Sequence, residues 1–121
     1  MEDIDFESDT FKDIVEKDDR YHPRAYALLT SVISFLSGEN GDRHMSGEDI
    51  LDEFREYTLD QYGPLSYRVL TEWGVKSCED VGEMMFNLVE AHRLARDEND
   101  SKEAFLGGYD FREAFLQPFE V

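Results

Sequence analysis

The chain has 121 residues, with 29 acidic against 12 basic side chains, which gives a formal net charge of −17. Apolar residues make up 40% and aromatic residues 13%, so the sequence predicts a folded domain rather than a disordered acidic chain. A charge of this sign repels the phosphates of nucleic acids and anionic membrane surfaces. It suits a basic protein partner or the imitation of a polyanion, or it serves solubility alone.

We expect a single domain in which a short helix precedes a helical core and a free tail follows it. Near the start of the chain, apolar residues recur at helical spacing at Phe11, Ile14 and Val15. This spacing predicts a satellite helix that docks on the core. The expected ranges are 1–20 for the satellite helix and connector, 21–116 for the core and 117–121 for the tail.

Four core helices are predicted from hydrophobic periodicity and from signals at the helix ends. Pro23 suits a first helical position, where its missing N–H does no harm. Ser46 and Ser77 each begin a capping-box pattern. Gly63 and Pro64 separate the second helix from the third, because glycine favours helix ends and proline favours helix starts. The expected helices are 23–37, 46–62, 64–73 and 78–92.

Glycine and other turn-forming residues mark further boundaries. The run 37–43 is expected to end the first core helix. Gly74 is expected to end the third, after which Val75 folds back as an apolar plug. Gly82 lies inside the fourth helix, where glycine costs about 0.5–1 kcal/mol relative to alanine. The close approach of another helix is the expected reason for this glycine.

The segment after the fourth helix predicts a small β-hairpin, with strands at 94–96 and 104–106 and a tip at 97–103. The range 109–115 is expected to form a last turn of helix. A helix followed by a hairpin is the order found in a winged-helix domain. The predicted fold is therefore mainly α, a single helical domain with a small C-terminal β-hairpin, winged-helix-like.

No catalytic residue, cofactor or metal site is predicted. Cys78 begins the fourth helix, but no histidine lies near it in sequence to act as a base, and the neighbouring acids raise the pKa of its thiol. The three histidines, His22, His44 and His92, share no helical face, which argues against a zinc site. The run 97–103 resembles a calcium loop, yet it lacks the turn glycine and the closing acid. We therefore expect that the protein is not an enzyme.

The compartment is predicted from cysteine usage and from the absence of targeting signals. A single cysteine excludes an internal disulfide and fits a reducing environment. The first residues lack the basic and apolar regions of a signal peptide. The longest nearly apolar run, 25–36, is too short to span a bilayer. These features predict a cytoplasmic protein.

The favoured function is a non-enzymatic acidic protein–protein interaction module, an adaptor or regulator. A winged helix invites DNA binding, but the fourth helix carries acids and no base between Glu79 and Glu90. An unidentified, basic protein partner fits this surface better than nucleic acid or a membrane. Two alternatives stay open, a nucleic-acid-binding winged-helix transcriptional regulator and a small enzyme with a carboxylate or metal site. The predicted interaction residues are Glu79, Glu83, Asn87, Glu90, Arg93 and Arg96.

Several specific strings occur between Arg20 and Phe115. They include His44-Met45-Ser46-Gly47, Trp73-Gly74-Val75, Phe86-Asn87-Leu88-Val89-Glu90 and Gly108-Tyr109-Asp110-Phe111. Together they resemble an uncharacterised small-protein family found mainly in Planctomycetes and Verrucomicrobia. Two positions depart from the family pattern: Val81 stands where an aromatic residue is usual, and His92-Arg93 stands where Gly-Leu is usual. The resemblance carries no activity, cofactor or partner, so the functional prediction rests on the residues themselves.

Overall fold

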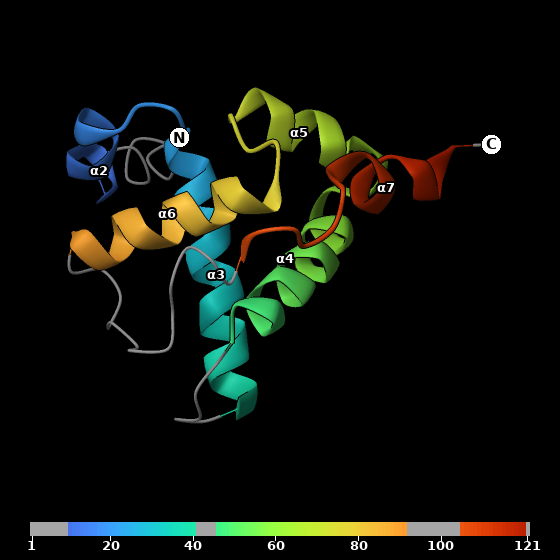
Figure 1. The fold of residues 1–121 in the computed structure, drawn as a ribbon, viewed down its shortest axis with the longest axis horizontal. Helices are drawn as coiled ribbons and strands as arrows, with labels where there is room; N and C mark the ends of the chain where they lie inside the picture. The colour runs from blue at the N-terminus through green and yellow to red at the C-terminus, as the bar shows by residue number, and fades with distance from the viewer. Residues whose placement is uncertain (1–9, 41–45, 92–104, 121) are drawn as a thin grey trace.

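The computed structural model describes residues 10–40, 46–91 and 105–120, and these form helices and their connections (Figure 1). The range 117–119, which was predicted to belong to a free tail, forms a 3₁₀ turn. The elements in chain order are α2 (Lys12–Lys17), α3 (Pro23–Asn40), α4 (Gly47–Tyr62), η1 (Gly63–Leu65), α5 (Ser66–Glu72), α6 (Cys78–Glu90), α7 (Phe111–Phe115) and η3 (Gln117–Phe119).

The helix starts follow the predicted capping signals. Ser46 Oγ accepts a hydrogen bond from the backbone N–H of Asp49 at 3.0 Å, and Asp49 Oδ2 accepts one from the N–H of Ser46 at 3.2 Å. Ser77 Oγ caps α6 in the same way at 3.3 Å. The four predicted core helices are present with shifted bounds. The helix α3 continues to Asn40, the predicted helix 64–73 divides into η1 and α5, and α6 ends at Glu90. Gly38 lies within α3 and its φ is not positive, unlike the left-handed glycine that commonly ends a helix.

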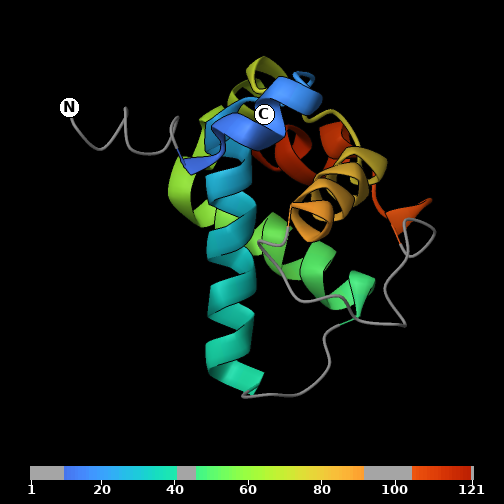
Figure 2. The ribbon, with the colours of Figure 1, turned by 90° about the vertical axis from the view of Figure 1, so that its left-hand side faces the viewer.

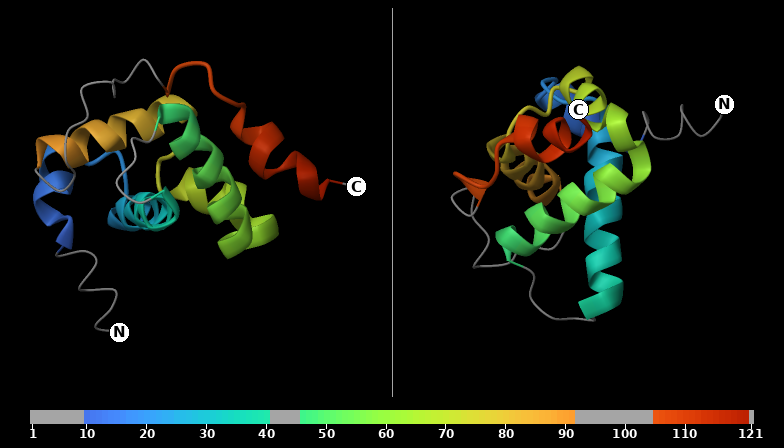
Figure 3. Two further views of the ribbon diagram at one scale, coloured as in Figure 1. Left: turned by 90° about the horizontal axis from the view of Figure 1, so that it is seen from below. Right: turned by 90° about the vertical axis from the view of Figure 1, so that its right-hand side faces the viewer.

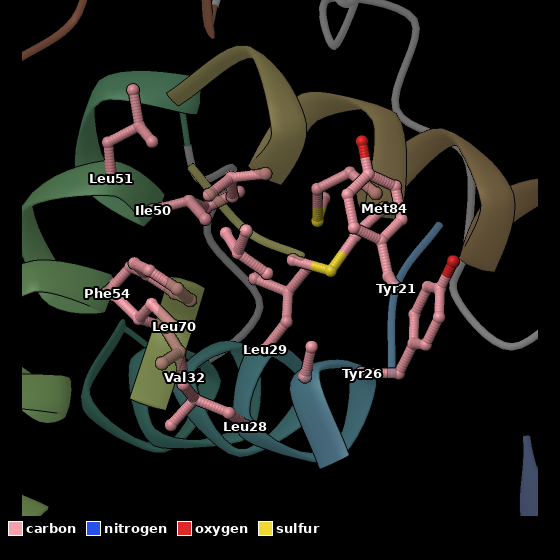
Figure 4. Packing of buried hydrophobic residues seen from close by; sticks show 14 of the residues in the cluster. Tyr21, Tyr26, Leu28, Leu29, Val32, Ile50, Leu51, Phe54, Leu70 and Met84 are labelled. Carbon is pink, nitrogen blue, oxygen red and sulfur yellow. The ribbon is translucent and has the colours of Figure 1, made fainter. Parts of the chain in front are cut away.

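The core lies where α3 packs against α4 and α6, while α5 and α7 close the end of α4 (Figures 1 and 4). Each of these helices contributes at least one side chain with no exposed surface. The five examples are Leu29, Phe54, Leu70, Leu88 and Phe115. Burial of a side chain of this size contributes about 1.5–3 kcal/mol relative to exposure.

The winged-helix prediction is wrong, because the described residues contain no β-strand. Phe105 begins a helical turn where the second strand was expected, and the range 94–104 of the predicted hairpin lies outside the described residues. We call the segment 105–110 the C-terminal strap. Its backbone N–H groups at Gly107 and Tyr109 donate to side chains of α6, at 3.4 and 3.3 Å, and therefore not to a neighbouring strand.

Gly82 allows an aromatic ring, rather than another helix, to approach α6. A Cβ atom built on Gly82 would lie 2.9 Å from Cβ of Phe105, which is 2% exposed. The expected approach of another helix at Gly82 is therefore wrong, because the close contact comes from the side chain of Phe105 in the strap. Phe105 fixes the strap against α6 at this point.

Replacing Gly82 with alanine should destabilise the protein by about 1 kcal/mol, because overpacking against Phe105 outweighs the gain in helix propensity. The matched control is Gly38→Ala in α3, where no atom lies within 4 Å of the added Cβ. That control should stabilise the protein by about 0.5–1 kcal/mol. Urea unfolding of both variants measures the difference, and a stabilised Gly82→Ala variant would contradict the packing of the strap on α6.

The helix α3 has 18 residues, and its C-terminal half extends beyond the other helices (Figure 2). Its inner side carries Leu28, Leu29 and Val32, which point toward the packed helices (Figure 4). Within the part of the chain that the structure describes, neither α3 nor another helix has the combined length and hydrophobicity needed to cross a membrane.

Candidate interaction surface

The outward side of α6 carries three glutamates and one phenylalanine. Glu79, Glu83, Phe86 and Glu90 follow one another at spacings of four, three and four residues, which places them on one side of a helix. Glu79 and Glu90 are exposed, Glu83 is half-buried, and Phe86 keeps 44% of its surface exposed. We call these four residues the acidic stripe.

The amphipathic pattern of α6 explains why the stripe faces outward. Val81, Met84 and Leu88 recur on the opposite side of the helix, and none of them has exposed surface. Because burial of this apolar side fixes the rotation of α6, the polar side must face away from the core. Hydrophobic periodicity therefore predicts Glu79, Glu83 and Glu90 correctly as surface residues. The same spacing could have identified Phe86, which the predicted set omits.

Asn87 lies beside the stripe and bonds within the protein. Its Nδ2 donates to Asp18 Oδ2 at 2.9 Å and to the hydroxyl of Tyr26 at 3.0 Å. Both partners come from distant parts of the chain, so local spacing gives no sign of these bonds. The amide hydrogens of Asn87 join α6 to α3 and to the connector before α3.

A bidentate ion pair holds the connector in place. The guanidinium group of Arg20 donates to both carboxylate oxygens of Asp18, at 2.8 and 2.6 Å, and its Nη2 lies 3.4 Å from Oε1 of Glu83. The hydrogen bond from Arg20 is the largest cause that lowers the pKa of Asp18 below its ordinary value. The positive charge of Arg20 thus offsets part of the negative charge of Glu83. Glu79 and Glu90 are the more exposed charges of the acidic stripe.

Two tyrosines extend this network beneath α6, and Figure 4 shows both hydroxyl groups pointing toward the helix. The Tyr21 hydroxyl donates to Asp80 Oδ1 at 2.6 Å, while Asp80 Oδ2 accepts from the N–H of Lys76 at 2.9 Å. Burial, together with the Asp80 carboxylate, raises the pKa of Tyr21. Asp80 is therefore an internal partner and not part of the surface available for binding.

Cys78 lies at the first residue of α6, under the strap. Its Sγ accepts a hydrogen bond from the backbone N–H of Tyr109 at 3.3 Å and lies 3.4 Å from the carbonyl oxygen of the same residue. Burial raises the pKa of this thiol, with a smaller contribution in the same direction from Glu79. A buried thiol with a raised pKa is a poor nucleophile. Cys78 therefore belongs to the packing between α6 and the strap.

A small hollow adjoins the C-terminal end of the stripe, between α2 and α6. It has a volume of about 110 Å³, below the roughly 300–1,000 Å³ typical of pockets for small ligands. Its size suits one side chain of a partner. In the described ranges, no group of three His, Cys, Asp or Glu residues could hold a metal ion. The residues around the hollow are Asp13, Ile14, Lys17, Asn87, Glu90 and Ala91.

Several predicted functional positions lie outside the described residues. These include Arg93 and Arg96 of the predicted interaction set, so the structure does not place them relative to the stripe. His44, His92 and the run 97–103, which the sequence argues against as metal ligands, also lie outside the described residues. The described part of the candidate surface therefore consists of α6 and its neighbours.

Two further arginines form ion pairs on helices other than α6. Arg55 of α4 bonds Glu56 at 2.9 Å, and Arg68 of α5 lies 3.4 Å from Glu72. Both pairs are exposed, so each contributes little to stability.

No protein-family model, curated protein or solved structure matches the chain. The resemblance to a small-protein family therefore stays a prediction.

Proposed function

We propose that the protein is a non-enzymatic interaction module whose acidic stripe on α6 binds a basic, amphipathic segment of a partner protein. The observation that carries this proposal is the exposed aromatic ring of Phe86 between glutamates on one helix side. An apolar anchor inside a charged rim is the usual composition of a protein-binding surface. The net charge of −17 attracts a cationic partner over a distance and speeds its association.

The geometry supports a helical partner segment in particular. The stripe runs along the 13 residues of α6, from Glu79 near its start to Glu90 at its end. A partner helix that lies along α6 can place an apolar residue on Phe86 and cationic residues near both exposed glutamates. The hollow beside Glu90 has room for one side chain, and the carbonyl groups at the C-terminal end of α6 favour a cation there.

The test uses a synthetic helical peptide with lysines on one side and leucines on the other, titrated into the full chain. The variant Glu79→Lys/Glu90→Lys should bind this peptide about tenfold more weakly, because it removes charge pairing at the surface. The control Asp60→Lys/Glu120→Lys changes the net charge by the same amount at exposed positions of α4 and the C-terminal end. The control should alter the affinity by less than about twofold.

Amide chemical shifts measured during the titration locate the contact. Shifts concentrated on α6, and lost in the variant Phe86→Ala, would support the stripe as the binding surface. Equal weakening by both double variants, or shifts spread over the acids of α4, would contradict it and leave only non-specific charge attraction. A matched peptide with glutamates in place of lysines should not bind.

A further inference from the structure

The two walls of the hollow between α2 and α6 are held together by hydrogen bonds. Figure 1 and the left view of Figure 3 show α2 beside the C-terminal end of α6. Asp18, which directly follows α2, accepts the bond from the Asn87 amide of α6 at 2.9 Å, and Arg20 donates to both oxygens of the same carboxylate. A site that is formed before its ligand arrives loses less conformational entropy on binding. The hollow, of about 110 Å³, is therefore a preformed position for one side chain of a partner.

The polar groups around the hollow are mainly hydrogen-bond acceptors. Both amide hydrogens of Asn87 are donated within the protein, which leaves the acceptor Oδ1 as its atom for a ligand. The carboxylates of Asp13 and Glu90 are charged acceptors in the same lining. Among the described residues of the lining, Lys17 alone carries a positive charge. A ligand with several donors therefore matches the hollow better than an anion does.

The charges near the hollow favour a cation. The lining holds two carboxylates against one ammonium group. The hollow also adjoins the C-terminal end of α6, whose carbonyl groups carry partial negative charge, and no basic residue occurs in the last turn of that helix. These charges lie within the field of a molecule with a net charge of −17. The ligand group expected here is therefore positively charged.

The composition of the hollow distinguishes arginine from lysine. Ile14, which is 3% exposed, and Ala91, which is half-buried, form its apolar part. Both basic side chains have an aliphatic stem that can lie on such a surface. The acceptors, however, come from two helices, Asp13 from α2 and both Asn87 and Glu90 from α6. A planar guanidinium group with five N–H donors can bond acceptors on both walls at once, whereas an ammonium group is a compact point charge.

We propose that the hollow binds one arginine side chain of the partner segment that lies along the acidic stripe. This inference rests on the proposed function and adds a requirement for arginine at one position of that segment. The stem of the arginine packs on Ile14 and Ala91, and its guanidinium group bonds Asp13, Asn87 Oδ1 and Glu90. The stripe attracts any basic, amphipathic helix, while the hollow selects between basic residues.

Isothermal titration calorimetry of the full chain with altered forms of the lysine and leucine peptide tests this site. The lysine at each end of the peptide is replaced in turn by arginine or by citrulline, which has the shape of arginine but no charge. At the end that reaches the hollow, the arginine peptide should bind about tenfold more tightly than the citrulline peptide, because citrulline cannot form charge-assisted bonds. It should bind about threefold more tightly than the lysine peptide, since an ammonium group cannot bond both walls.

Removal of the cation from the hollow should strengthen binding. Lys17→Gln should bind the arginine peptide about threefold more tightly, because the variant no longer repels the guanidinium group. The matched control is Lys12→Gln, at another exposed position of α2, which makes the same change of net charge outside the lining. The control should alter the affinity by less than about 1.5-fold at 0.15 M salt, where separated surface charges are largely screened.

Filling the hollow should remove the preference for arginine. Ala91→Leu places a larger apolar side chain in the lining and should reduce the ratio of the arginine to the citrulline affinity from about ten to below about two. The lysine peptide should still bind to this variant, because the exposed residues Glu79 and Phe86 of the stripe are unchanged. Urea unfolding confirms that the variant is folded at the temperature of the titration.

The outcomes separate the arginine site from the proposed function. Equal affinities of the arginine and citrulline peptides, or equal effects of Lys17→Gln and Lys12→Gln, would overturn the arginine site while binding to the stripe remains. If none of the peptides binds, both proposals are wrong. Amide chemical shifts that differ between the arginine and citrulline complexes should lie in 13–17 and 87–91. Differences confined to other helices would place the arginine elsewhere and overturn the proposal.

Discussion

Replacing Gly74 with alanine is expected to destabilise the protein by about 3 kcal/mol or more, because two unfavourable effects add. Gly74 has φ of +88°, a left-handed conformation that side chains with a Cβ rarely adopt. The added Cβ would also collide with the backbone carbonyl oxygen of Arg20, which cannot move alone. The neighbouring bond from the N–H of His22 to the carbonyl oxygen of Trp73, at 3.0 Å, would be strained as well.

The matched control for this variant is Gly63→Ala. Gly63 also has a positive φ, +51°, but a Cβ there would meet nothing within 4 Å. The fall in stability of Gly63→Ala should therefore be limited to the conformational cost of about 1–3 kcal/mol. Urea unfolding, followed by circular dichroism, compares the two. Equal decreases in the free energy of unfolding for the two variants would show that the connector does not pack on the turn at Gly74.

Replacing Asp18 with asparagine should cost about 2 kcal/mol at pH 7, since it removes the charge that pairs with Arg20 and accepts from Asn87. The pKa of Asp18 lies below its ordinary value of 3.8 in the folded protein. A carboxyl group with a lowered pKa stabilises the fold above its unfolded pKa, and this contribution is lost as the pH falls toward its folded pKa. The difference between wild type and variant should therefore shrink below about pH 4.

Thermal unfolding at several pH values between 7 and about 2 measures this dependence for Asp18→Asn. Asp60→Asn, at an exposed position of α4, is the control and should change stability by less than about 0.5 kcal/mol. A penalty for Asp18→Asn that stays constant down to the lowest pH would mean that its charge is not the stabilising feature.

Signals close together in sequence predicted most of the helices. Ser46 with Asp49 gives the start of α4, and Gly63 with Pro64 gives the break between α4 and the turn that leads to α5. Each signal depends on backbone groups within one turn of helix, so the chain itself contains the needed information. The end of the first core helix was the exception. The run 37–43 was expected to end it, yet α3 continues to Asn40 and Gly38 lacks the positive φ of a typical helix-ending glycine.

The C-terminal part could not be predicted, because its conformation depends on distant contacts. The short apolar run around Phe105 is compatible with a strand or with a turn, and periodicity alone does not separate them. Its ring packs on Gly82, and the backbone beyond it bonds to Glu79 and Cys78. These contacts with α6, which precedes the strap in the chain, replace the partner strand that a hairpin would need.

The candidate surface shows the same division between local and distant information. The outward positions of Glu79, Glu83 and Glu90 follow from the helical repeat of α6 alone. The internal role of Asn87 depends on Asp18 and Tyr26, which lie 69 and 61 residues away in sequence. An asparagine side chain can bind a partner at the surface or form hydrogen bonds inside the protein. Residue type alone therefore did not show which role Asn87 has.

The buried thiol of Cys78 can be used to measure how often the strap separates from α6. Sγ of Cys78 lies under Gly108 and Tyr109, and a Cβ on Gly108 would approach it to 2.7 Å. A disulfide reagent can reach this sulfur only after the covering segment lifts, so its reaction rate measures how often that event occurs. Comparison of this rate with the rate of complete unfolding would show whether residues 105–120 detach from α6 before the rest of the protein unfolds.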